Sequence, residues 1–86
     1  MTRDEFVDSV RNIVEGRDKV HGKPEDTFEK IASLWTFYLH KVITRKDVAC
    51  MMILFKVARL QNNMNNEDNW IDIAGYAVCG GTNEQG

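Results

Sequence analysis

Residues 47–60 read Asp-Val-Ala-Cys-Met-Met-Ile-Leu-Phe-Lys-Val-Ala-Arg-Leu and place apolar side chains on almost every side of a helix. A helix that is apolar nearly all round is usually central and buried. Thr44, with Asp47 three residues later, is a typical helix start, and the Asn-rich residues 61–66 indicate a turn. We therefore predict a buried central helix over residues 45–61.

The same kinds of signal predict three further helices. Thr2 and Glu5 form a Thr-x-x-Glu capping pattern, and Gly16 supplies a helix stop. Pro24 fits the first position of a helix, and Asn66 or Asn65 fits the cap of the last one. The sequence thus predicts an all-α fold, a compact bundle of four helices at about 3–15, 24–40, 45–61 and 67–79. These form a single domain over residues 1–81, followed by a polar tail over 82–86.

The composition bounds the class of protein. Eighty-six residues, 43% hydrophobic and 28% charged, suit one globular core. The net charge of -2 argues against duplex nucleic acid as the main ligand but leaves room for a nucleotide. Cys50 and Cys79 are expected to be reduced, buried thiols. No apolar run is long enough for a membrane span or a leader, so we expect a cytoplasmic protein. Small size and several large apolar side chains lead us to expect a homo-oligomer.

Charged residues on the predicted central helix indicate a polar site against the core. Lys56 and Arg59 are three residues apart and share a helix face, and buried cations need partners. Asp68 and Asp72, four apart on the next helix, are the obvious candidates. One interpretation is an ion-pair network that fixes helix packing. The other is a phosphate clamp, completed by residues of the predicted loop 17–23, namely Arg17, Lys19 or His21.

Aromatic and acidic residues allow two more interpretations each. Trp70 and Tyr76 pack in the core or an interface by default, but one of them could stack on a base.

Acids spaced four apart on two helices could converge on Mg²⁺, which prefers oxygen ligands. Glu25 and Asp68 also lie in the first turns of their predicted helices, where acids suit the helix dipole, whereas Asp72 lies mid-helix between Ile71 and Ile73. The metal set would be Glu25, Glu29, Asp68 and Asp72.

Two polar signatures bracket the apolar helix and resemble those of a known family. They are Arg17-x-x-x-His21-Gly-x-Pro-Glu-Asp-x-Phe28 and Asp68-Asn-Trp-x-Asp-x-Ala-Gly-Tyr-Ala. With Asp47-Val-Ala-x-Met-Met between them, they resemble a family of short bacteriophage and prophage proteins, a domain of unknown function (DUF6378). His21 stands where tyrosine is commoner. The resemblance marks Arg17, His21, Gly22, Pro24, Glu25, Phe28, Trp35, Asp47, Lys56, Arg59, Asp68, Trp70, Asp72, Gly75 and Tyr76.

A remoter resemblance is to the all-α, MazG-like nucleoside triphosphate pyrophosphohydrolases. That family is helical and oligomeric, and it holds Mg²⁺ with acids from paired helices. Its usual pattern is Glu-x-x-Glu followed by Glu-x-x-Asp. This chain has Glu25-x-x-x-Glu29 and Asp68-x-x-x-Asp72 instead.

These observations lead to one main hypothesis and two alternatives. We expect a small phage-encoded accessory protein of the host bacterial cytoplasm that binds a nucleotide or a nucleotide-derived signal. It would have no catalytic residues and no cofactor, and it would sequester a host immune messenger. Its ligand-binding residues would be Arg17, Lys19, His21, Lys56, Arg59, Trp70, Asp72 and Tyr76. The first alternative is a Mg²⁺-dependent pyrophosphohydrolase that uses the four acids. The second is an anti-CRISPR-like inhibitor that binds a host defence protein.

Overall fold

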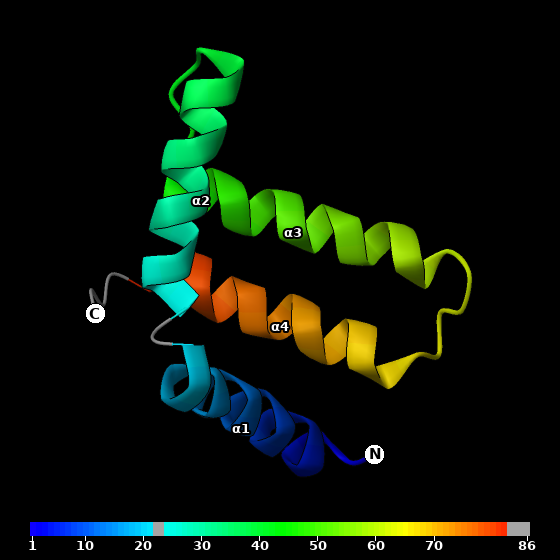
Figure 1. The fold of residues 1–86 in the computed structure, drawn as a ribbon. Helices are drawn as coiled ribbons and strands as arrows, with labels where there is room; N and C mark the ends of the chain where they lie inside the picture. The colour runs from blue at the N-terminus through cyan, green and yellow to red at the C-terminus, as the bar shows by residue number, and fades with distance from the viewer. Residues whose placement is uncertain (22–23, 83–86) are drawn as a thin grey trace.

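The computed structural model describes residues 1–21 and 24–82, with side chains described for 1–16 and 25–82. The described residues form four α-helices, which confirms the all-α prediction: α1 (Arg3–His21), α2 (Pro24–Leu39), α3 (Arg45–Leu60) and α4 (Glu67–Gly81). Figure 1 shows α3 and α4 side by side as a hairpin, with α1 on the other side of α4. The α2 helix crosses the end of the hairpin and extends beyond α3 (Figure 1).

Local hydrogen bonds place the helix starts where the capping patterns predict them. The Asp47 N–H donates to Thr44 Oγ1 at 3.2 Å, and the Thr44 N–H donates to Asp47 Oδ2 at 2.9 Å. Thr2 and Glu5 form the same reciprocal pair at the start of α1. Because both carboxylates accept a backbone N–H at the cap, the pKa values of Asp47 and Glu5 are lowered. Asn66 Oδ1 accepts the Asn69 N–H at 2.9 Å and caps α4.

The prediction that Gly16 ends the first helix is wrong. The α1 helix continues to His21, six residues beyond the predicted end at residue 15. Gly16 does not adopt the left-handed backbone that a glycine helix stop requires. A glycine inside a helix costs only about 0.5–1 kcal/mol relative to alanine, and the helix-compatible residues after it carry α1 onward. The predicted loop 17–23 is therefore mostly helix, and its residues 22–23 lie outside the described ranges.

The core lies where α2, α3 and α4 meet. It is built from Phe28, Ala32, Val48, Ala49, Tyr76 and Cys79. The α3 and α4 helices approach closely at Gly80, where an added Cβ would lie 2.8 Å from the Ala49 Cβ. Helix α1 packs more loosely, with Ile13 facing Gly75 of α4. The helix with neighbours on several sides is therefore α4.

The prediction that residues 45–61 form a helix buried all round is wrong. Only one side of α3 is covered, because α1 packs against α4 instead. Met51, Leu54 and Phe55 are exposed on the uncovered side. Cys50 is exposed as well, against expectation, whereas Cys79 is buried as predicted. The apolar residues on the uncovered side of α3 therefore form an exposed apolar surface.

The end of α2 has little cover from the rest of the chain. His40 has a left-handed φ of 55° and reverses the chain just after α2. The Ile43 N–H then donates to Thr36 Oγ1 at 2.8 Å, and the Thr36 hydroxyl donates to the Ile43 carbonyl at 3.2 Å. These bonds hold the returning chain against the helix. We call residues 33–43 the arm.

Among the described residues, no helix combines the length and the apolar character needed to cross a membrane.

Candidate functional site

Lys56 and Asp72 form an ion pair between the two helices of the hairpin. The Lys56 Nζ lies 2.9 Å from Asp72 Oδ2, and the side chains are only 12% and 17% exposed. Lys56 projects from the covered side of α3, toward α4. The prediction that Lys56 finds an acidic partner on the following helix is confirmed. An ion pair this well covered contributes to how α3 and α4 fit together.

Arg59 differs from the prediction, because it is exposed and not buried beside the core. Its guanidinium carbon lies 4.8 Å from the centroid of the Phe55 ring, within cation–π range. The Lys56 Nζ lies 5.7 Å from the same centroid. Arg59 sits on the uncovered side of α3, which explains why the charge needs no buried partner. No carboxylate in the described part of the chain pairs with Arg59.

Phe55 is a residue of this site that the sequence reasoning missed. Its ring is half exposed and lies close to both cations. The available signal was the spacing, since Phe55 and Arg59 are four residues apart and so are neighbours on a helix surface. A helix that the sequence predicts to be buried all round gives this spacing no functional meaning. Phe55, Lys56, Arg59 and Asp72 form what we call the hairpin cluster.

Trp70 and Tyr76 occupy different environments. Trp70 is partly exposed in the first turn of α4, and its indole N–H donates to the Met64 carbonyl at 2.8 Å. Tyr76 is buried, with its ring centroid 5.9 Å from that of Phe28. Trp70 is therefore available to a ligand at the loop end of the hairpin, whereas Tyr76 is part of the core.

The four acids of the predicted metal set are not brought together. Glu25 is buried in the first turn of α2, and Glu29 Oε1 lies 3.5 Å from Arg45 Nε. Arg45 contacts the carbonyl of Cys79, near the C-terminal end of α4, whereas Asp68 lies in the first turn of α4. At 1.5 Å per residue, Asp68 and Cys79 are roughly 16 Å apart along the helix. No three His, Cys, Asp or Glu side chains within the described residues could hold one metal ion.

Arg45 is a buried cation that the sequence reasoning did not single out. Its Nη1 donates to the Cys79 carbonyl at 2.6 Å, and its Nη2 donates to the Thr82 carbonyl at 3.0 Å. Lys46 Nζ donates to the Gly80 carbonyl. Both cations offset the negative end of the α4 dipole. The available signal was two basic residues in the first turn of α3, where they are unfavourable for that helix alone.

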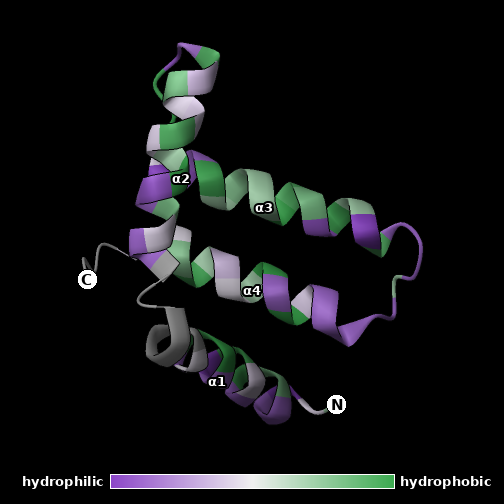
Figure 2. Cartoon of the chain, in the orientation of Figure 1, coloured by the Kyte–Doolittle hydropathy of each residue, from purple (hydrophilic) through white to green (hydrophobic). Residues whose placement is uncertain are grey.

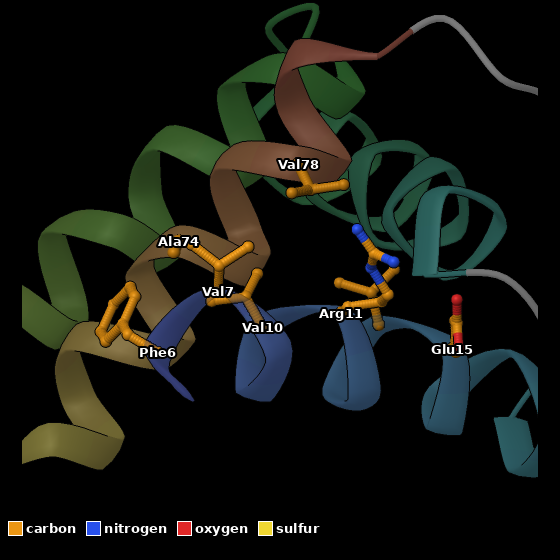
Figure 3. Close-up of a pocket in the computed structure, with 8 residues that line it drawn as sticks. Phe6, Val7, Val10, Arg11, Glu15, Ala74 and Val78 are labelled. Carbon is orange, nitrogen blue, oxygen red and sulfur yellow. The ribbon is translucent and has the colours of Figure 1, made fainter. Parts of the chain in front are cut away.

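An apolar cavity of about 430 Å³ lies between α1 and α4. In Figure 3, Val7 and Val10 of α1 face the same space as Ala74 and Val78 of α4. Phe6 stands at one end, and Arg11 and Glu15 lie toward the other (Figure 3). None of the predicted ligand-binding residues with a described side chain lines this cavity. The side chains of Arg17, Lys19 and His21 lie outside the described residues, so their predicted role stays a prediction.

Comparison with known proteins gives the family. The family described as "Domain of unknown function (DUF6378)" matches residues 5–84. The chain is 39% identical over 75 residues to the "Gene 55 protein" of Mycobacterium phage D29, covering 86% of this chain and 50% of that protein. It is 42% identical over 71 residues to the "Gene 55 protein" of Mycobacterium phage L5, covering 80% of this chain and 46% of that protein.

The chain thus spans about half the length of the curated relatives it matches. No solved structure matches it. The family match covers nearly the whole chain, including most of α1, the other three helices and the hairpin cluster, and the chain belongs to the DUF6378 family.

Proposed function

We propose that the protein binds a nucleotide or a nucleotide-derived signalling molecule at the hairpin cluster, without turning it over. The observation that carries this proposal is Arg59, whose guanidinium lies over a half-exposed aromatic ring and is not paired with a described carboxylate. A guanidinium donates two parallel hydrogen bonds to a phosphate, and an exposed ring offers a face to a base.

The surroundings of Arg59 support a division of roles. Lys56 adds positive potential from the same helix, while Asp72 fixes its position at 2.9 Å. Trp70, partly exposed in the first turn of α4, provides a second aromatic surface at the loop end of the hairpin. In this arrangement Arg59 takes the phosphate and Phe55 or Trp70 stacks on the base. A phage protein of this kind would act by sequestering a host immune messenger.

Isothermal titration against linear and cyclic nucleotides tests the proposal. We expect binding by the wild-type chain, at least a tenfold loss of affinity for Arg59→Ala, and a similar loss for Phe55→Ala. Lys30→Ala, which removes an exposed cation from α2, is the control and should bind like wild type. Absence of binding across the panel would refute the proposal.

The fate of the ligand separates binding from turnover. After incubation with Mg²⁺, chromatography should recover the nucleotide intact. Release of pyrophosphate from a nucleoside triphosphate would instead support the MazG-like alternative. Affinity should also fall as salt is raised, because the main contact is between Arg59 and a phosphate.

A further inference from the structure

The arm carries apolar side chains that the described residues leave uncovered, although Trp35 and Ile43 pack against the core. The first half of α2 has buried residues, namely Glu25, Phe28 and Ala32, but no α2 residue after Ala32 is buried. Phe37 and Tyr38 are each 80% exposed. Figure 1 shows the end of α2 standing clear of α3, and Figure 2 shows apolar residues along it.

Local contacts nonetheless hold the end of the arm together. Thr36 exchanges two hydrogen bonds with the backbone of Ile43. The His40 ring lies 6.5 Å from the Phe37 ring, just where the chain reverses. An apolar surface that is fixed in shape before binding loses little conformational entropy when it is covered.

A second uncovered apolar surface runs along α3. Met51, Leu54 and Ala58 are spaced three and four residues apart, so they form one stripe on the helix, and all three are exposed. Leu54 alone is 65% exposed. We call these three residues the α3 stripe. It carries no charge, and Lys41 is the only Lys, Arg, Asp or Glu among residues 33–43.

The combined area is that of a stable protein interface. The exposed apolar side chains of the arm and the stripe are Leu34, Phe37, Tyr38, Leu39, Val42, Met51 and Leu54. At about 200 Å² for a fully open large side chain, their exposed fractions correspond to roughly 900 Å². A standard interface buries about 800 Å² on each partner.

We infer that the arm and the α3 stripe form the interface of a symmetric dimer, in which the arm of each copy lies along the α3 stripe of the other. The two surfaces lie on consecutive parts of one chain, and Lys41 is the only Lys, Arg, Asp or Glu in either of them. A two-fold axis therefore lets one chain supply both halves of each contact, as a closed symmetric dimer requires. This inference does not rest on the proposed ligand, because the hairpin cluster is a separate set of residues.

The mass in solution is the first test. Sedimentation equilibrium on the whole chain should give a dimer, twice the chain mass of 9.9 kDa, with a Kd below about 10 µM. Tyr38→Glu in the arm and Leu54→Glu in the α3 stripe should each give monomers. Met64→Glu, an apolar-to-acid change at an exposed site in the α3–α4 loop, should stay dimeric. A monomeric wild-type chain would overturn the inference.

Mixing the two variants tests the pairing of arm with stripe. In a heterodimer of Tyr38→Glu and Leu54→Glu, one contact contains both changes, and the other joins an intact arm to an intact stripe. Mixing should therefore restore dimers that neither variant forms alone. Failure to restore them, with both variants helical by circular dichroism, would refute the arm-to-stripe arrangement. A wild-type chain that stays monomeric until another protein covers the arm would refute it too.

Discussion

Lys56→Met is the substitution that best separates the structural role of the hairpin cluster from its proposed binding role. At 2.9 Å, the attraction between Lys56 and Asp72 is roughly 6 kcal/mol with an effective dielectric constant of about 20. Desolvation of the two charges offsets most of this attraction. Methionine keeps the apolar length of lysine but removes the cation beside Asp72.

The expected loss follows from how well the pair is covered. Removing one partner of a fully buried pair costs about 3–5 kcal/mol. Exposures of 12% and 17% let water reach these side chains, so we expect a smaller loss, about 2–3 kcal/mol. For a domain of this size, that corresponds to a decrease in Tm of roughly 10–20 °C. Urea unfolding, followed by circular dichroism, measures the free energy directly.

A paired replacement checks that the loss comes from the charge. Lys56→Met with Asp72→Leu removes both charges, so its stability should return to within about 1 kcal/mol of wild type. Lys30→Met, at an exposed position of α2, is the matched control and should change little. If Lys56→Met alone unfolds like wild type, the ion pair does not hold α3 and α4 together, and Lys56 is free to serve a ligand.

Three further predictions test the packing and the caps. Gly80→Ala should lower stability, because the new Cβ would lie 2.8 Å from the Cβ of Ala49. Such overpacking costs about 1–3 kcal/mol, more than alanine gains in helix propensity. Equal or higher stability in urea would show that α3 packs on α4 more loosely. Gly16→Ala should raise stability by about 0.5–1 kcal/mol, since nothing lies within 4 Å of the new Cβ. A loss of stability in urea would argue for a helix stop at residue 16. Because the Thr44 backbone and hydroxyl lower the pKa of Asp47, its stabilisation is complete above the ordinary Asp pKa and is lost as pH falls through the lowered value. Asp47→Asn should therefore flatten the dependence of Tm on pH below about pH 4, and an unchanged acid profile would contradict the capping argument.

Helix starts were predictable from the sequence because caps are local. The reciprocal bonds of Thr44 with Asp47 need only residues three apart, and the structure contains them. The end of α1 was not predictable in the same way. A glycine such as Gly16 either reverses the chain or continues the helix, and the choice depends on contacts elsewhere.

The candidate site was only partly predictable, because helix periodicity does not say which neighbour covers which face. Lys56 was assigned an acidic partner on the right helix, since a cation on a covered face needs one. The apolar pattern of α3 predicts an interior position for Arg59 as for the rest of the helix, and the same pattern gives no reason to place Phe55 in an exposed site. Arg45 contacts residues more than thirty positions away, a tertiary relationship that no local spacing contains.

The contacts of Arg45 and Lys46 with the last turn of α4 have a consequence for the order in which the molecule opens. The hairpin of α3 and α4 is joined by its loop at one end and by these side-chain bonds at the other. Neither helix can fray at that end without breaking bonds to its partner. Amide protons of α3 and α4 should therefore exchange with solvent together and last, while those of α1, which borders a cavity, exchange earlier through local opening.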